Sequence, residues 1–217
     1  MKIHITLIFL LLTLCATPAL AQFKFGVTAG LNISKFTVSD SDYKSYIDKI
    51  RPGFFVGPTV IFDIPKTGVG VDASALFDMR GARSKSYSNT ETVRCYSFQF
   101  PVNIRYGYSF GDWVYGFIFT GPQIGLSIGN RNHYIIPVID KSTGHTFERR
   151  WTDETSSFSW NFGIGGVVLE KVQVRISYNL ALRKTGEIQL ANPANGKSRT
   201  LADGKAHACQ VALSYLF

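Results

Sequence analysis

Eight segments of this chain alternate apolar and polar residues with a period of two. They cover residues 23–34, 53–64, 69–80, 97–106, 113–129, 158–168, 172–181 and 205–217. Successive side chains of a strand point to opposite faces of its sheet, so each segment predicts a β-strand with one apolar face. Long polar connections and connections of a few residues follow one another in turn, which predicts antiparallel strands in an up-and-down order.

The two faces of the predicted strands differ in composition. In segment 97–106 the apolar face carries Phe98, Phe100, Val102, Ile104 and Tyr106, and the other face carries Ser97, Gln99, Pro101, Asn103 and Arg105. The bulky face suits lipid, and the small or amide face suits a narrow packed interior. A soluble barrel of lipocalin type, the alternative, would need Lys and Glu on its outer face. We therefore expect an all-β fold, an eight-stranded antiparallel transmembrane β-barrel of the outer-membrane type.

Two of the long connections contain further strand signals. Residues 135–139 and 145–149 flank a polar tetrapeptide, and residues 187–190 and 198–201 flank Asn195-Gly196, a strong hairpin signal. We expect both pairs to be strands that continue beyond the plane of the membrane.

The chain ends on an apolar-faced strand. Tyr215 and Phe217 share that face, and the last residue is aromatic. An unpaired strand edge is an aggregation template, so this strand requires a partner, which a closed barrel supplies as its first strand. The pattern is similar to the C-terminal signal of bacterial outer-membrane barrels, and it predicts recognition by the barrel-insertion machinery.

The first residues predict export. Lys2 precedes an apolar run over residues 5–14, and Ala19-Leu20-Ala21 is a small-x-small cleavage site defined by Ala19 and Ala21. This is the composition of a secretory signal peptide over residues 1–21, which leaves residues 22–217 as a single barrel domain. A lipoprotein anchor at Cys15 is the alternative, although Leu14 is bulkier than lipoprotein processing favours.

Charge and cysteine content exclude several classes of function. The formal net charge is +8, but Lys and Arg are scattered over the connections, which suits anionic lipid headgroups or acidic glycans better than nucleic acid. Cys95 and Cys209 fall on opposite strand faces, which disfavours a disulfide. No Cys/His spacing, Gly-rich loop or nucleophile motif indicates a metal, a cofactor or a catalytic centre.

Four charged residues fall on the predicted inner face near one end of the barrel. Asp63, Asp72, Arg105 and Arg175 are therefore expected to form a structural charge network, in which Arg105 is a partner of Asp72 on the neighbouring strand. A proton or ion path through the same groups is the alternative.

Two histidine settings offer an enzymatic alternative to this structural interpretation. His207 and Cys209 form a His-x-Cys pair that faintly resembles the His-x-Ser of a lipid A deacylase. The connection over residues 130–156 contains His133, Asp140, His145 and Asp153. Neither set has a defined acid and nucleophile, so we predict that the protein is not an enzyme.

The whole chain after residue 21 resembles the small PorT-like outer-membrane barrels common in Bacteroidetes-type bacteria. The resemblance rests on residues 25–32, on segment 98–106 with Pro101 in the middle of its strand, on the dipeptide Gly121-Pro122, and on the last four residues. It implies location and fold more than activity. The expected function is a scaffold, adhesion or partner-binding barrel whose outside loops bind a protein or glycan; an outer-membrane hydrolase and a narrow solute pore are the alternatives.

Overall fold

A computed structural model describes residues 23–38, 49–85, 90–111, 113–129, 132–139, 146–191 and 198–217. The predicted signal peptide, with Ala19 and Ala21, lies outside these residues. The described strands, in chain order, are β1 (Phe23–Val38), β2 (Lys49–Asp63), β3 (Val69–Ser74), β4 (Leu76–Lys85), β5 (Thr90–Phe110), β6 (Val114–Ile128), β7 (Asn132–Ile139), β8 (Thr146–Asp153), β9 (Ser156–Val168), β10 (Val172–Ala181), β11 (Gly186–Ala191) and β12 (Ser198–Leu216). Within these ranges, no helix has the length and apolar content needed to cross a membrane.

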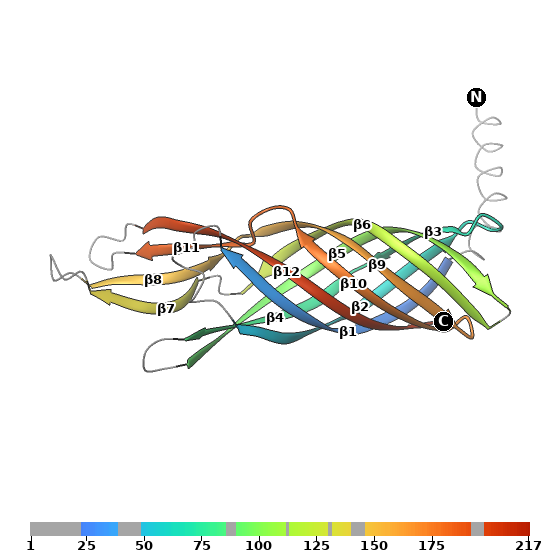
Figure 1. The fold of residues 1–217 in the computed structure, drawn as a ribbon, viewed down its shortest axis with the longest axis horizontal. Coiled ribbons are helices and arrows are strands. Elements are labelled where there is room, and N and C mark those ends of the chain that lie inside the picture. The colour runs from blue at the N-terminus through green and yellow to red at the C-terminus, as the bar shows by residue number, and fades with distance from the viewer. Residues whose placement is uncertain are drawn as a thin grey trace, which may run out of the picture.

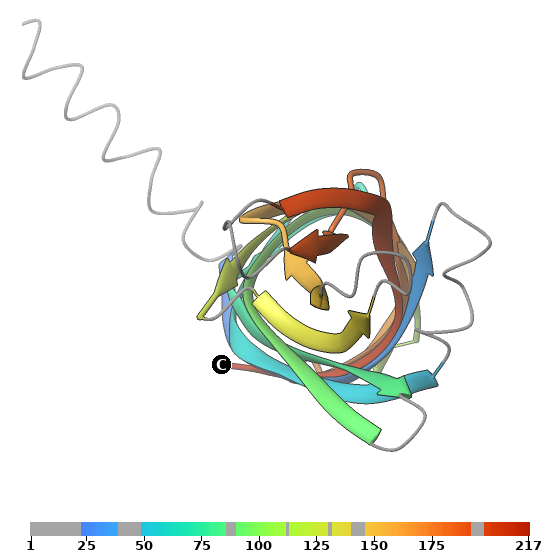
Figure 2. The same cartoon turned by 90° about the vertical axis from the view of Figure 1, so that its left-hand side faces the viewer.

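The strands close into a barrel of eight positions, which confirms the predicted fold (Figures 1 and 2). β3 and β4 lie end to end and together fill one position. In order around the barrel, the eight positions are therefore β1, β2, β3/β4, β5, β6, β9, β10 and β12, and all of the pairings are antiparallel. The last strand returns to the first, with a register that runs from Gly26 opposite Leu216 to Val38 opposite Gly204. The amide of Phe217 donates to the carbonyl of Phe25 at 2.8 Å, so the closure extends to the last residue.

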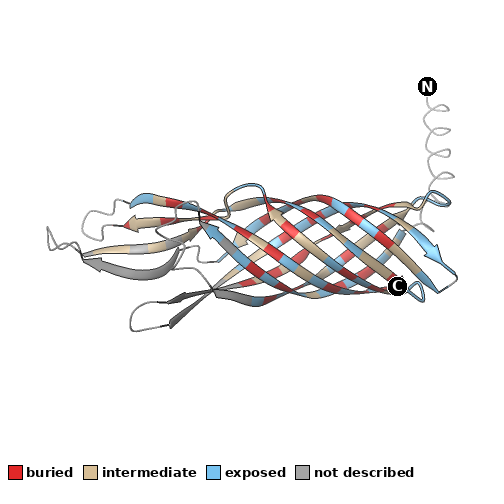
Figure 3. Ribbon diagram, in the orientation of Figure 1, coloured by how far each residue is buried: buried red, intermediate tan, exposed pale blue. Residues whose placement is uncertain are grey.

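The predicted alternation of faces is confirmed along the barrel strands (Figure 3). On the outer face Leu31, Ile104 and Leu213 are each more than half exposed, as lipid-facing side chains must be. On the inner face Thr28, Asn103 and Ser214 are almost completely buried. Cys209 is exposed on the outer face and Cys95 is half-buried on the inner one.

One predicted strand, segment 69–80, is divided at Ala75 into β3 and β4. The amide of Ala75 donates to the carbonyl of Pro58 at 3.0 Å. Proline has no N–H to return a second hydrogen bond, so the ladder between β2 and its neighbour is weakened at this point.

The barrel has two unlike ends. At the short-turn end, the connections at 64–68, 111–113 and 169–171 join neighbouring strands. At the long-loop end, β12 continues past the ring and pairs with β11, which pairs with β8, which pairs with β7. We call this four-stranded sheet the extension; it projects along the long axis of the barrel in Figure 1. Its strands confirm the two predicted pairs.

Candidate functional site

The four predicted charged residues lie on the inner face near the short-turn end, but the structure divides them into two ion pairs. The first pair joins Arg105 on β5 to Asp63 at the end of β2. The Nε atom of Arg105 donates to Asp63 at 3.0 Å, and one terminal nitrogen makes a second contact with the same oxygen. The other terminal nitrogen donates to Gln173 on β10 at 3.1 Å. All three nitrogens of the Arg105 guanidinium are therefore occupied.

The second pair joins Arg175 on β10 to Asp72 on β3. A terminal nitrogen of Arg175 lies 3.2 Å from Asp72, and the amide of Asn103 donates to the same carboxylate oxygen at 2.9 Å. The Asp72 side chain is completely buried. The expected partnership of Asp72 and Arg105 is not present, because Asp72 lies opposite Asn103 in the register and Arg105 lies opposite Gly70.

Aromatic rings of β6 pack against both arginines. The Arg105 guanidinium carbon lies 5.1 Å from the ring centre of Phe117 and 5.7 Å from that of Tyr115, and Arg175 lies 5.7 Å from Phe119. Such cation–π contacts help to hold a guanidinium in a space with little water. They explain how two arginines are tolerated inside a barrel of this strand number.

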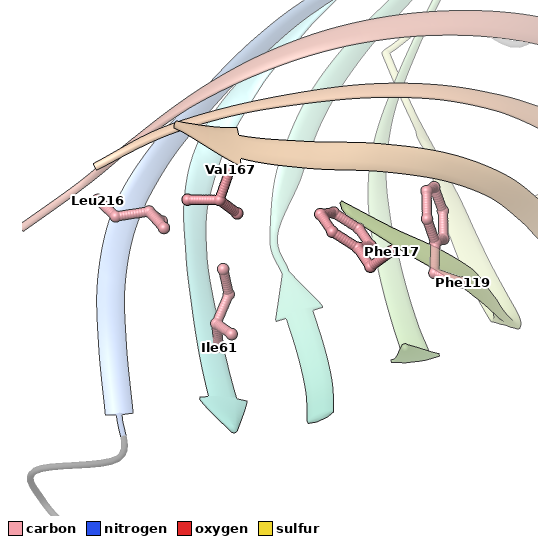
Figure 4. Close-up of a cluster of buried hydrophobic side chains, with 5 residues drawn as sticks. All are labelled: Ile61, Phe117, Phe119, Val167 and Leu216. Carbon is pink, nitrogen blue, oxygen red and sulfur yellow. The ribbon is translucent and has the colours of Figure 1, made fainter. Parts of the chain in front are cut away.

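An apolar cluster fills the lumen beside these charges (Figure 4). Its members come from β2, β6, β9 and β12, and each is at most 6% exposed: Ile61, Phe117, Phe119, Val167 and Leu216. An eight-stranded barrel is only wide enough for side chains to fill it. In the half of the barrel near the short turns, the apolar cluster and the two ion pairs together occupy the lumen.

A chain of hydrogen-bonded amides lines β5, β6, β9 and β10 further along the lumen. Asn179 donates to Asn161 at 2.7 Å, Asn161 to Gln123 at 2.8 Å, and Gln123 to Gln99 at 2.8 Å. Gln99 then donates to Ser97 at 2.7 Å. Asn161, Gln123 and Gln99 each both donate and accept, and Asn179 also donates to Ser159 at 2.9 Å, so this buried polar layer is held together without charge.

Nearer the long-loop end, Arg80 donates through Nε to Asp78 at 2.6 Å, and the Asn32 amide contacts the other oxygen of the same carboxylate. Asp78 is 1% exposed. The lumen therefore contains charged layers at two levels with an uncharged amide layer between them.

One lysine connects the extension to the barrel. The ammonium group of Lys184 lies 2.8 Å from Glu154, 3.2 Å from Glu187 and 3.8 Å from Asp203. The hydrogen bonds to Glu154 and Glu187 raise the pKa of Lys184, and the hydrogen bond from Gln189, followed by that from Lys184, lowers the pKa of Glu187. These contacts surround the point where β11 begins.

The predicted histidine sites are not assembled as catalytic groups among the described side chains. His207 is on the outer face of β12; its Nδ1 accepts the Ala181 amide at 3.2 Å, and its ring stacks on Tyr178. Within the described part of the chain, no acid or hydroxyl is hydrogen-bonded to this imidazole. Asp140, His145 and the side chain of His133 lie outside what the structure describes. Asp153 is buried near Cys95 rather than exposed in a loop.

The predicted insertion signal is accessible at the end of β12. Tyr215 and Phe217 are 49% and 78% exposed, and their rings meet edge to face at 5.5 Å. Sequence reasoning did not identify Gln173, Asn103 and the Phe117 ring as members of the charge network. The alternation of the strands predicts that all three side chains point into the barrel. It does not predict which of them contact the charged residues.

Comparison with known proteins gives a family and a set of distant structures. A model of the outer membrane protein β-barrel domain family matches residues 7–217. OprG from Pseudomonas aeruginosa is 11% identical, with 90% of this chain and 94% of that chain covered and a TM-score of 0.49. The N-terminal β-barrel domain of OprF from the same organism is 8% identical, covers 88% and 97%, and has a TM-score of 0.35.

The outer membrane protease OmpT from Escherichia coli is 12% identical, with 90% and 96% covered and a TM-score of 0.39. No curated protein matches the chain. Similarities of this size carry no argument about activity, so any function has to be argued from the chain itself.

Proposed function

Because the chain belongs to the outer membrane protein β-barrel domain family, we propose that it is a non-enzymatic, non-conducting barrel that binds a protein or glycan through its extension. Barrels of the outer membrane have short periplasmic turns and longer outside loops. The short-turn end accordingly faces the periplasm, and the extension faces the outside of the cell.

The filled lumen carries this proposal. A solute that crosses the membrane through the barrel must pass the short-turn half, where Ile61 is 0% exposed, Leu216 1% and Arg105 2%. Two ion pairs hold the polar part of this packing in place, so opening a path requires breaking buried charge pairs. This argues against the narrow solute pore.

The extension supplies the surface for binding. Backbone ladders continue from β12 through β11 and β8 to β7, and Lys184 fixes the junction with three carboxylates. Among the described strands, β7 pairs only with β8, so its other edge is available to an added strand. The extension is therefore held in one arrangement, and its β7 edge can bind a partner.

The hydrolase alternative finds little support in the surroundings of His207, because the Nδ1 atom of this residue already accepts a hydrogen bond from a backbone amide at the end of β10.

We also propose a closer relationship with the PorT-like barrels, which rests on segment 98–106 and the last four residues. Tyr215 and Phe217 are proposed as the residues that the insertion machinery reads.

Removing the outer hairpin tests the proposal. Asn132 and Thr152 are register partners, so replacing residues 133–151 by Asn-Gly joins them through a two-residue turn and removes most of β7 and β8. We expect the shortened barrel to insert and keep its heat-modifiable gel mobility, but to lose partners that surface cross-linking captures with the parent. The variant Lys171→Gln, in a periplasmic turn, should keep those partners.

Three outcomes would overturn the proposal. Steady conductance of the parent in planar bilayers would establish the pore. Hydrolysis of lipid A or peptides that His207→Ala abolishes would establish the enzyme. Capture of the same partners by the parent and the shortened barrel would remove the extension as the binding surface.

A further inference from the structure

The periplasmic mouth of the barrel is hollow. A cavity of about 490 Å³ lies between the short turns, and its lining includes Lys24, Lys66, Tyr108, Trp113, Tyr115 and Glu170. Its floor includes Arg105, Val167 and Leu216, which belong to the packing described above. Pockets of about 300–1,000 Å³ are the size that small organic molecules occupy in proteins.

Two lysines at this mouth have no partner among the described residues. Lys24 lies on the inner face of β1, half-buried, in register with the completely buried Ile61. Lys66 occupies the turn between β2 and β3 with a φ of 66°. Neither makes an ion pair or a side-chain hydrogen bond with a described residue, whereas Arg105 is occupied by Asp63 and Gln173. Lys24 and Lys66 are therefore the cationic groups available to a ligand.

The charges of the lining sum to a positive value. Among the described lining residues, Lys24, Lys66 and Arg105 give three positive charges and Asp63 and Glu170 give two negative ones, a sum of +1. Asp63 and Arg105 neutralise each other, which leaves two lysines against Glu170. A concave wall whose unpaired charges are mainly of one sign concentrates ligands of the opposite sign.

Aromatic rings form the other part of the wall. Trp113 is 68% exposed, and the hydroxyl of the inward-facing Tyr115 donates to the Gly68 carbonyl at 3.1 Å, which fixes that ring against the turn. Aromatic rings beside unpaired ammonium groups suit a ligand with a flat or ring-shaped body and an acidic group.

We propose that this cavity binds a soluble organic anion from the periplasm, one with a ring and a phosphate or carboxylate group. The acidic group contacts Lys24 and Lys66, and the ring packs on Trp113 and Tyr115. Lys24 points toward the barrel axis, so the site opens to the periplasm and not to the lipid face. This site is independent of the extension, and the two proposals can fail separately.

The test uses the full-length barrel in an uncharged maltoside detergent, with 4-nitrophenyl phosphate as the probe. Binding is measured by equilibrium dialysis and by quenching of tryptophan fluorescence. We expect saturable binding at one site, competition by excess inorganic phosphate, and no binding of 4-nitrophenyl glucoside, which has the ring without the charge. Lys24→Gln and Lys66→Gln should each weaken binding about fivefold, the effect of one solvated charge in contact with another.

Lys171→Gln is the matched control, because Lys171 is an exposed lysine in a neighbouring turn and does not line the cavity. It should bind like the parent, and Trp113→Phe should lose most of the quenching. Heat-modifiable mobility establishes that each variant is folded. The site would be disproved if folded Lys24→Gln and Lys66→Gln bind like the parent, if Lys171→Gln weakens binding equally, or if the glucoside binds as well as the phosphate.

Discussion

Asp63 and Arg105 meet across Gly70, which lies between them in the register of β2, β3 and β5. A Cβ atom on Gly70 would stand 2.5 Å from the Asp63 carboxylate oxygen and 2.9 Å from Nε of Arg105. The pair therefore depends on a missing side chain in the strand between its members.

The first prediction follows from this relationship. Gly70→Ala should displace the ion pair and destabilise the barrel by about 1–3 kcal/mol, the usual cost of overpacking a filled interior. Gly166→Ala is the control, because its added Cβ would meet nothing closer than 3.7 Å. Urea-dependent unfolding in lipid vesicles measures both variants. Equal midpoints for Gly70→Ala and the parent would contradict the geometry.

The second prediction separates the two ion pairs. In double-mutant cycles, Asp72→Asn should couple strongly to Arg175→Leu and weakly to Arg105→Leu, because Asp72 contacts only the first of these arginines. Arg175→Leu alone should cost about 3–5 kcal/mol, since it leaves a completely buried carboxylate uncompensated. Arg105→Leu should cost less, because Asp63 is one-third exposed. Strong coupling of Asp72 to Arg105 would restore the pairing that the sequence suggested.

The third prediction concerns the turn between β9 and β10. Leu169 and Glu170 both have positive φ, at 53° and 58°, and the Lys171 amide donates to the Val168 carbonyl at 3.3 Å. Side chains other than glycine are strained in this region by about 1–2 kcal/mol. Glu170→Gly should therefore raise the urea midpoint. Lys171→Gly, at a position without a positive φ, should lower it or leave it unchanged.

The fourth prediction concerns pH and the junction of the extension. The pKa of Glu187 is lowered from 4.5, so its contribution to stability is present above pH 4.5 and is lost as pH falls through its folded value. The pKa of Lys184 is raised from 10.5, so its contribution is present below pH 10.5 and is lost as pH rises through its folded value. The junction should be most stable between these limits.

Hydrogen exchange of the Glu154 and Thr185 amides reports on this junction, once corrected for the intrinsic pH dependence of exchange. Both amides donate across it, to Thr185 and Gly204 respectively. Lys184→Gln should reduce their protection at neutral pH, where three carboxylates then repel one another. Unchanged protection in this variant would show that the backbone ladders alone hold the extension.

The face of each barrel residue could be predicted from the sequence, because strand alternation permits only two choices and lipid accepts only one of them. Phe98 and Arg105 were assigned on this basis. Side-chain partners could not be predicted in the same way. Adjacency of strands in the predicted sheet suggested Asp72 as the partner of Arg105. The Arg105 side chain is long enough to pass over Gly70 of the adjacent strand β3, and it contacts Asp63 on β2 instead. The break at Ala75 depends on Pro58 in the facing strand, which becomes visible only once the register is known.

The seam between β1 and β12 has a consequence for how the barrel forms. Thr28 and Ser214 share a buried hydrogen bond of 2.8 Å across this seam, although 186 residues separate them in the chain. Contacts between such distant residues contribute nothing until the loop that joins them has closed, and chains dominated by them fold slowly. Closure of the ring must therefore await the arrival of β12 beside β1. Until then β1 has an unpaired edge, and the nascent protein depends on whatever shields that edge from other chains.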